Sequence, residues 1–292
     1  MPRPRDPLRI AMHVVPYVAF YFLLASLAGP LFLWLGGYLL GVTASLLFAA
    51  IFVNWLAMRI FEDRPLADAG LWWSHASADN LAFGLAGGIG GVCLALVPAL
   101  VAGGCHWELT PGEPFSLTTL LFVVLLLVAG AAGEELFFRG YGLQVLVASI
   151  GPYAAVVPVG IAFALLHANN PHATWFGVAN TAGFGILFGC AYLRSRDLWL
   201  PFGLHFGWNF TLLLFGVPIS GLKMNVMGHA MVWSAGKWVS GGEYGPEASV
   251  LTSAVLVAFF VYIYKAPIRR QASPLTDPQE SAVCEPPPPL PS

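Results

Sequence analysis

The stretch LLFVVLLLVAGAAGEELFFRG, residues 120–140, begins as an apolar run and ends with three charged side chains, Glu134, Glu135 and Arg139. Such a run can form part of a helix that crosses the ~30 Å hydrocarbon core of a membrane. An ionised side chain at the bilayer centre costs about 2.5–3.5 kcal/mol on insertion scales. Charged residues in such a segment are therefore candidates for function, and they usually face the interior of a helix bundle.

The composition of the whole chain is that of a membrane protein. Of its 292 residues 58% are hydrophobic and 10% are charged, against about 25% charged residues in soluble domains. The net charge of -2 provides no basic field, so nucleic acid is not an expected partner. The cysteines have no CxxC spacing, which argues against a disulfide framework and against a thiolate metal site. They are Cys93, Cys105, Cys190 and Cys284.

Eight apolar segments are long enough to cross a membrane, on the rule that about 20 residues are needed. They are residues 9–28, 36–58, 79–103, 117–148, 152–169, 174–194, 198–216 and 248–266. The first has a basic start but no small-residue cleavage site, so we expect an uncleaved span and not a signal peptide. The predicted fold is all-α, a polytopic membrane protein of about eight transmembrane helices.

The Lys and Arg residues test this span count. With a cytoplasmic N-terminus, ten of them lie on the cytoplasmic side and two in the outer loops, with Arg139 set aside. This bias agrees with the positive-inside rule, and one missed helix would scatter it. The cytoplasmic residues are Arg3, Arg5, Arg9, Arg59, Arg64, Arg194, Arg196, Lys265, Arg269 and Arg270, and the outer ones are Lys223 and Lys237. We expect both termini to be cytoplasmic, in a plasma membrane of the bacterial type.

Two overlapping GxxxG spacings occur in GLAGGIGG, residues 84–91. They pair Gly84 with Gly88 and Gly87 with Gly91. Small residues at this spacing let helices approach closely in lipid, whereas a phosphate-binding loop would need a following GK[ST]. We therefore expect close helix packing in this segment.

Three polar clusters lie within the predicted spans. Glu135 and Arg139 are four residues apart with the acid first, the favoured arrangement for a pair on one helix face. Glu134 points about 100° away around the helix axis, so its carboxylate is available. The other clusters are His167, with Phe163 one turn before it, and the pair His205 and Asn209, which share a helix face. The remaining histidines lie near helix ends or in loops and are expected to be structural: His13, His75, His106, His172 and His229.

The depths of these clusters in the membrane, counted in residues from the nearest turn of the chain, agree only in part. If the chain turns at residues 149–151, Glu134 and His167 lie 17 and 16 residues from Gly151, ~25 Å each way. They can therefore meet. His205 lies only eight residues beyond Asp197, or ~12 Å, which requires either a hairpin that projects from the membrane or strongly tilted helices.

A carboxylate, two imidazoles and an amide can together hydrolyse a peptide bond. Glu134 could act as the general base, and a histidine could hold the water or protonate the leaving amine. The Asn209 amide could donate to an oxyanion. Glu134, His167 and His205 could instead bind a zinc ion, although HExxH is absent.

The same residues resemble the motifs of a known family. EELFFRG (134–140), FALLH (163–167) and HFGWN (205–209) look like the ordered motifs EExxxR, FxxxH and HxxxN of the CPBP family, also called Abi, the CAAX proteases and bacteriocin-processing proteins. The family includes the type II CAAX prenyl endopeptidases. The resemblance covers residues 117–216 and implies an intramembrane endopeptidase whose active site lies within the helix bundle.

The resemblance implies a role for each motif residue. Glu134 would activate water, His167 and His205 would position water or a metal, and Asn209 would donate to the oxyanion. Glu135, Arg139 and Phe163 would give structural support. A metalloprotease and a metal-free, glutamate-dependent protease both remain open, as does the identity of the substrate, a membrane-embedded or lipidated protein or peptide that could be prenylated.

This reading divides the chain into four parts. Residues 1–116 form an N-terminal region of three membrane helices, 117–216 the catalytic core, 217–266 an outer loop and the last helix, and 267–292 a disordered, proline-rich cytoplasmic tail. Cys284 does not form a CaaX box.

Two other functions use the same polar groups. One is a non-catalytic scaffold or sensor, which loss of a motif residue would favour. The other is a proton-coupled transporter, which internal repeats would favour.

Overall fold

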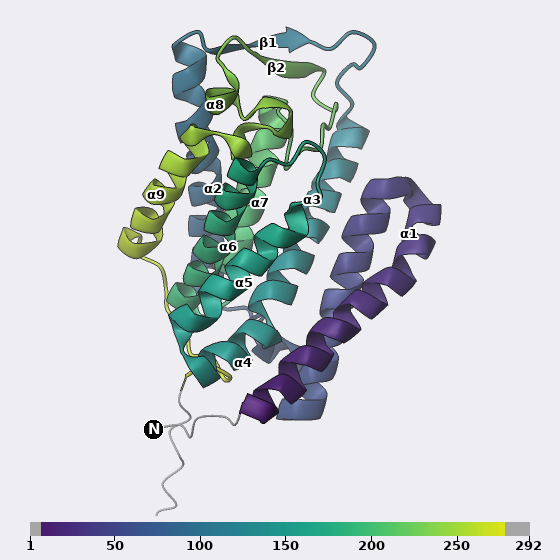
Figure 1. Cartoon of the computed structure of the whole chain (residues 1–292), viewed down its shortest axis with the longest axis vertical. Helices are drawn as coiled ribbons and strands as arrows, with labels where there is room; N and C mark the ends of the chain where they lie inside the picture. The colour runs from purple at the N-terminus through teal and green to yellow at the C-terminus, as the bar shows by residue number, and fades with distance from the viewer. Residues whose placement is uncertain (1–6, 278–292) are drawn as a thin grey trace, which may run out of the picture.

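The computed structural model describes residues 7–277, and helices dominate this part of the chain (Figure 1). The helices are α1 (Pro7–Ala57), α2 (His75–Val101), α3 (Leu117–Arg139), α4 (Tyr141–Ile150), α5 (Pro152–His167), α6 (Trp175–Ser195), α7 (Trp199–Phe215), α8 (Lys237–Ser240) and α9 (Val250–Lys265). Four short helical turns connect them: η1 (Met58–Glu62), η2 (Leu66–Ala69), η3 (Gly242–Tyr244) and η4 (Pro246–Ala248). The all-helical prediction missed one feature, the antiparallel pair β1 (Cys105–Leu109) and β2 (His229–Trp233) at one end of the bundle.

Every predicted span coincides with helix, but the count of eight crossings is not confirmed. Among the described residues, four helical stretches are long and apolar enough to cross a membrane: Ile10–Glu62, His75–Val101, Leu117–Ile150 and Trp175–Ser195. Helices α5 and α9 are apolar but have 16 residues each, and α7 has 17. The structure thus supports an all-α membrane protein whose helices differ widely in length.

Helix α1 contains the first two predicted spans as the limbs of one hairpin (Figure 1). The helical path breaks at Gly36 and Gly37, and the φ of Gly37 is +79°, a conformation that favours glycine. One limb approaches the other closely, since a Cβ on Gly41 would lie 3.0 Å from Cα of Leu33. The hairpin exposes large apolar side chains on its outer surface, as expected for contact with lipid, among them Leu23, Leu27, Leu31 and Trp34.

The predicted span 117–148 is broken at Gly140, which separates α3 from α4. Asn54 of α1 holds this break: its Oδ1 accepts the Tyr141 N–H at 2.8 Å and its Nδ2 donates to the Leu136 carbonyl at 3.1 Å. A Cβ on Gly140 would lie 2.4 Å from Oδ1 of Asn54. Glu134 therefore lies five residues before the end of its helix. The mismatch in depth with His205, which an unbroken helix implied, is thereby removed.

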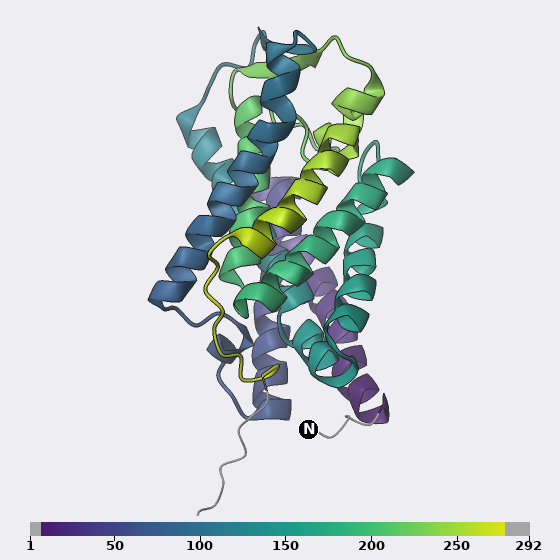
Figure 2. The ribbon, with the colours of Figure 1, turned by 90° about the vertical axis from the view of Figure 1, so that its left-hand side faces the viewer.

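The two GxxxG pairs of α2 face different helices. Cβ atoms on Gly84 and Gly88 would lie 2.5 and 2.4 Å from backbone carbonyl oxygens of α7, whereas Gly87 and Gly91 meet side chains of α9, Tyr262 and Phe259. Figure 2 shows α9 passing beside α2. The predicted close packing is confirmed, and it fixes the position of α7.

Helix α7 also has glycines where it contacts α2. Gly203 and Gly207 approach the backbone of α2 so closely that Cβ atoms would lie 2.7 and 2.9 Å from its carbonyl oxygens. At about 100° per residue, positions two residues later point about 200° away. His205 and Asn209 therefore project from the face of α7 opposite to α2, toward the middle of the bundle.

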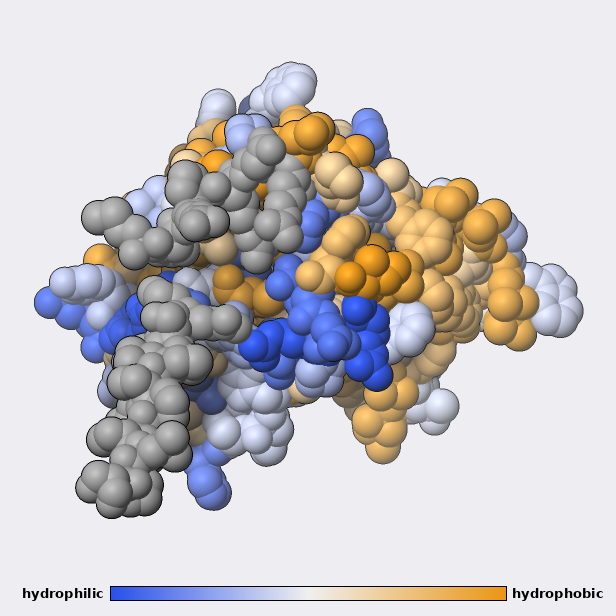
Figure 3. Space-filling model, turned by 90° about the horizontal axis from the view of Figure 1, so that it is seen from below, coloured by the Kyte–Doolittle hydropathy of each residue, from blue (hydrophilic) through white to orange (hydrophobic). Residues whose placement is uncertain are grey.

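The segment after α9 returns along the end of the bundle that carries the N-terminus (Figure 1). Asp197 accepts hydrogen bonds from Asn80 Nδ2, at 2.8 Å, and from Gln271 Nε2, and Ile268 and Leu275 are buried. Residues 267–277 thus pack against the helices, in contrast to the disordered tail that was expected, and residues 278–292, with Cys284, lie outside the described part. Seen from this end, polar residues gather toward the middle and apolar ones over the α1 side (Figure 3).

Candidate active site

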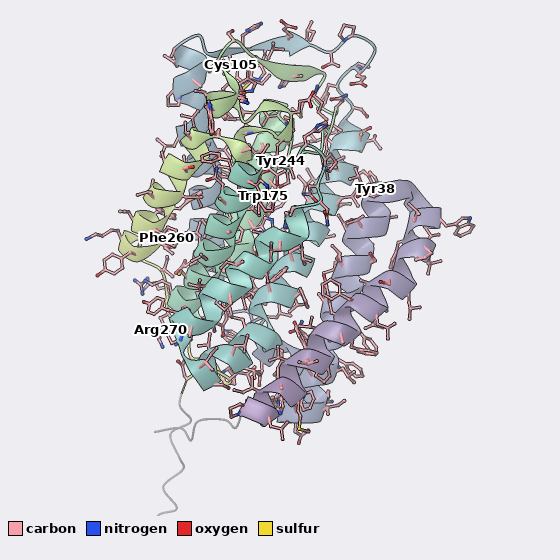
Figure 4. The ribbon with its side chains drawn as sticks, viewed as in Figure 1. Tyr38, Cys105, Trp175, Tyr244, Phe260 and Arg270 are labelled. Carbon is pink, nitrogen blue, oxygen red and sulfur yellow. The ribbon has the colours of Figure 1, made fainter. Side chains whose placement is uncertain are left out.

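A cavity of about 280 Å³ lies where α3, α5 and α7 meet, and it brings together the three polar clusters. Its polar wall contains Glu134 from α3, His167 from α5, and His205 with Asn209 from α7. From there the cavity extends between α3 and the second limb of α1, where Val42 and Leu46 line it. Tyr38, near the turn of α1 (Figure 4), lines its outer part and is 65% exposed, so the cavity reaches the surface there.

Glu134 faces both histidines without a direct hydrogen bond to either. Its Oε2 lies 3.9 Å from Nε2 of His167 and 3.8 Å from Nε2 of His205. This oxygen is buried and has no hydrogen-bond partner among the described side chains and backbone groups. A buried polar atom without a partner points to a bound water or ion. The carboxylate that sequence geometry left unpaired is therefore the one at the centre of the site.

The other nitrogen of each histidine fixes its tautomer. Nδ1 of His205 lies 2.9 Å from Oε1 of Glu135, and Nδ1 of His167 lies 2.8 Å from the Phe163 carbonyl oxygen. An ionised carboxylate and a carbonyl can only accept, so both Nδ1 atoms carry the hydrogen. In each neutral imidazole the lone pair of Nε2 is then turned toward Glu134.

Glu135 and Arg139 form the buried ion pair that the i,i+4 spacing predicted. Both side chains are almost fully buried, and Nη1 of Arg139 lies 3.2 Å from Oε1 of Glu135. Nη2 donates to the Gly185 carbonyl of α6 at 2.8 Å. The guanidinium lies 4.9 to 5.5 Å from the centres of three aromatic rings, those of Phe138, Phe163 and Phe188. The pair therefore joins α3 to α6 beneath the cavity.

Phe163 links this pair to the histidines. Its ring lies 4.9 Å below the guanidinium carbon of Arg139 and 4.6 Å from the ring of His167. Its backbone carbonyl also accepts from Nδ1 of His167. The expectation that Phe163 lies beneath His167 agrees with this geometry, and the carbonyl contact adds a reason why the ring orientation of His167 is fixed.

Sequence reasoning missed several further polar residues in the cavity wall, among them Asn170, Trp208, Ser220 and Glu247. Glu247 lies in η4, in a glycine-rich loop without hydrophobic periodicity, so no sequence pattern indicated that its side chain would be buried. Asn170 belongs to the polar segment after α5, and its Nδ2 donates to the Ser220 carbonyl at 3.2 Å. Two loops far apart in sequence thus close one end of the cavity.

The other histidines lie away from the cavity lining. His13 contacts the Tyr141 hydroxyl, His229 a backbone carbonyl, and His106 and His172 contact Glu108 and Glu243 near the surface. His75 begins α2. These positions agree with the expectation that the chemistry involves His167 and His205.

Glu134, His167 and His205 supply donor atoms that zinc accepts, and they lie somewhat farther apart than the ligands of a bound ion. Neighbouring ligands on a tetrahedral zinc ion lie about 3.4 Å apart, given bonds of about 2.0–2.2 Å, whereas the two distances to Oε2 are 3.8 and 3.9 Å. Within residues 7–277 no group of three His, Cys, Asp or Glu side chains is placed to hold a metal ion. The three groups line a cavity that has room for water.

Comparison with known proteins identifies the region that carries this site. Residues 116–211 match the family model described as type II CAAX prenyl endopeptidase Rce1-like. No curated protein and no solved structure matches the chain. The matched region runs from the start of α3 into α7 and includes every residue of the EExxxR, FxxxH and HxxxN motifs. Over this region the chain is similar to the type II CAAX prenyl endopeptidases, which supports the resemblance to the CAAX protease (CPBP) family that the motifs indicated.

Proposed function

We propose that the protein is an endopeptidase that uses water activated by Glu134 to cut a membrane-associated or lipidated protein or peptide. One observation carries the proposal: the partnerless Oε2 of Glu134 faces the Nε2 atoms of His167 and His205 at 3.9 and 3.8 Å. A water molecule between these atoms can donate to the carboxylate and to one imidazole. Its oxygen is then oriented for attack on a carbonyl carbon in the cavity.

The reaction proceeds through a tetrahedral intermediate. Glu134 takes a proton from the water as its oxygen bonds to the carbonyl carbon, and the carbonyl oxygen becomes negatively charged. The side-chain amide of Asn209 donates a hydrogen bond to this oxyanion. When the intermediate collapses, the C–N bond breaks and the proton held by Glu134 passes to the leaving amine, directly or through a histidine. The free carboxylate is then restored for the next cycle.

Glu135 and Arg139 support this chemistry without touching the substrate. The Glu135 carboxylate accepts from Nδ1 of His205 and thereby keeps the Nε2 lone pair directed at Glu134. Arg139 neutralises the charge of Glu135. Without that cation a second buried carboxylate would stand next to Glu134 and raise the cost of ionising both.

The shape of the cavity favours a substrate that comes from the membrane. Its outer part is lined by apolar residues of α1 and α3, among them Leu39, Val42 and Leu126, so it suits a lipid chain or an apolar peptide segment. A prenylated C-terminus is one substrate of this kind. The distribution of Lys and Arg supports a cytoplasmic location for both termini, and the β1–β2 end would then lie on the outer side.

A metal-dependent reaction is the alternative form of the same proposal. Glu134, His167 and His205 would be the ligands, and the metal would lower the pKa of the bound water. The metal-free form is supported by the finding that no three His, Cys, Asp or Glu side chains in the described residues are placed to hold a metal ion. Metal analysis of the purified, active protein distinguishes the two.

The decisive experiment compares cells that carry the wild type with cells that carry Glu134→Gln. The amide keeps the size of the side chain but cannot take a proton, so the variant should insert and fold yet leave the substrate uncut. Proteomics of the termini of membrane proteins should then reveal new termini only with the wild type. Glu113→Gln, at an exposed carboxylate before α3, is the matched control and should behave as the wild type. Identical termini in wild-type and Glu134→Gln cells would refute the proposal.

A further inference from the structure

A second carboxylate, Glu247, lines the cavity, and it lies outside residues 116–211, which match the family model. Glu247 belongs to η4, which precedes α9, and only 7% of its surface is exposed. It lines the same cavity as Glu134, at the end where the 217–248 loop covers α7. The reaction proposed above gives Glu247 no part, so the reason for a buried charge at this position must be sought in the substrate.

Hydrogen bonds hold this carboxylate in place. Its Oε1 accepts the Trp208 indole N–H at 3.3 Å, and its Oε2 accepts the Ser220 hydroxyl at 2.9 Å and the Ser220 backbone N–H. The Glu247 backbone carbonyl accepts Nδ2 of Asn180 in α6 at 2.8 Å. All three partners can donate to the carboxylate, and two of them, the indole and the backbone N–H, can only donate. Burial raises the pKa of the Glu247 carboxyl, and these hydrogen bonds oppose that rise because they favour the ionised form.

This negative charge has no permanent cation beside it. Among the described residues, the cavity wall contains two carboxylates, Glu134 and Glu247, and neither Lys nor Arg. The nearby Arg139 is already paired with Glu135 beneath the cavity. His167 is the titratable side chain that interacts with Glu247 from α5, and Tyr244 is the one from the same loop. The polar end of the cavity is therefore negative whenever both carboxylates are ionised.

A fixed charge in a cavity of low polarity discriminates between substrates by their charge. An acidic side chain or a free terminal carboxylate placed next to Glu247 would be repelled, and neither charge could be screened by solvent. A Lys or Arg side chain would instead supply the missing cation. Such selection by repulsion is a common way to achieve specificity.

We propose that Glu247 is a specificity-determining residue, which makes the enzyme reject acidic residues, and accept neutral or cationic ones, in the substrate segment bound beneath the 217–248 loop. This inference rests on the proposed endopeptidase function. It also implies that a free C-terminal carboxylate of the substrate lies outside this part of the cavity.

The test uses a membrane-anchored peptide that contains a cleavage site found by the proteomics of termini. Each residue that flanks the cut bond is replaced in turn by Gln, Glu or Lys, and kcat/KM is measured for each peptide in proteoliposomes. At one or more positions the wild type should cut the Glu peptide about tenfold or more slowly than the Gln peptide. Glu247→Gln should bring this ratio close to one.

Three variants separate charge from structure. Glu247→Asp keeps the charge and should keep the discrimination, as should Ser220→Ala, which removes a hydroxyl donor but no charge. Glu243→Gln removes a carboxylate that is 81% exposed and lies in the adjacent turn η3, and it should also leave the ratio unchanged. If Glu247→Gln does not insert into the membrane, the wild type and Glu247→Asp still test the proposal. Both must cut the Glu peptides more slowly than the Gln peptides.

The outcomes distinguish the two proposals. Cleavage by the wild type with equal kcat/KM for Gln and Glu peptides at every position overturns the role of Glu247 and leaves the endopeptidase function intact. The same conclusion follows if the ratio of kcat/KM between Gln and Glu peptides is equal in the wild type and in Glu247→Gln. Cleavage that persists in Glu134→Gln, or no cleavage by the wild type, overturns both.

Discussion

Glu135 and His205 are joined by a buried contact of 2.9 Å between Oε1 and Nδ1, although they lie 70 residues apart in the chain. This contact separates the functions of two adjacent glutamates. Glu135 uses its oxygen to orient a histidine, and Glu134 meets the other nitrogen of the same histidine at 3.8 Å. The EExxxR and HxxxN motifs are therefore parts of one hydrogen-bonded unit, in which Glu135 fixes the orientation of His205.

The two glutamates should respond differently to the same isosteric change. Glu135→Gln leaves the buried Arg139 without a counter-charge, and loss of one partner of a buried pair destabilises proteins by about 3–5 kcal/mol. Glu134→Gln removes a carboxylate that has no cation partner and should leave stability nearly unchanged. Thermal unfolding of the purified variants in detergent measures both. Equal losses of stability would contradict the division between a supporting and a reacting carboxylate.

The packing of α2 against α7 should be essential for activity. A Cβ on Gly88 would lie 2.4 Å from the Leu204 carbonyl oxygen and 2.6 Å from the Trp208 nitrogen, so Gly88→Ala must displace α7. Overpacking of this kind costs about 1–3 kcal/mol, and it moves His205 and Asn209 relative to Glu134. We expect a loss of activity of at least about tenfold, since small misplacements of reacting groups are costly.

The neighbouring Gly90 supplies the control for this experiment. A Cβ at Gly90 meets no atom within 4 Å, so Gly90→Ala should insert, fold and cleave as the wild type does. Similar activity in Gly88→Ala and Gly90→Ala would show that the position of α7 does not depend on these glycines.

Asn209 should affect the chemical step more than binding. If its amide donates to the oxyanion, Asn209→Ala should lower kcat by about 10²–10³ and change KM little. Asn209→Asp keeps the size but removes the donor, so it should be impaired to a similar degree. A variant with normal kcat and a raised KM would instead assign Asn209 to substrate binding.

Removal of metal should leave the activity intact. Among the described residues, no group of three His, Cys, Asp or Glu side chains is placed to hold a metal ion. We therefore expect activity to persist after prolonged dialysis against a chelator, with less than one metal ion per molecule by elemental analysis. Loss of activity on chelation that returns with zinc would establish the metal-dependent form.

The residues that meet in the cavity were more predictable from the sequence than the path of the chain. The polar clusters were recognisable because charges in apolar helices are costly, and helix periodicity alone separated Glu134 from Glu135. The break at Gly140 was not predictable, because a glycine in an apolar run is tolerated in a helix and the residue that stabilises the break, Asn54, lies 82 positions before Leu136, whose carbonyl it binds. Glu247 was missed for a related reason: its burial depends on the fold of a loop, which has no periodic pattern.

The segment after α9 gives the last prediction. Asp197, fully buried between α6 and α7, accepts from Asn80 Nδ2 at 2.8 Å and from Gln271 Nε2. In Asp197→Asn an amide hydrogen would face one or both of these donors, and a buried donor left without an acceptor costs about 1–3 kcal/mol. The variant should unfold at a lower temperature, and proteases should cut residues 266–277 more readily. Asp79→Asn is the control, because the pair between Asp79 and Arg269 is exposed and such pairs contribute about 0–1 kcal/mol. If both variants retain wild-type stability and protease resistance, the contacts of residues 267–277 do not hold this end of the bundle together.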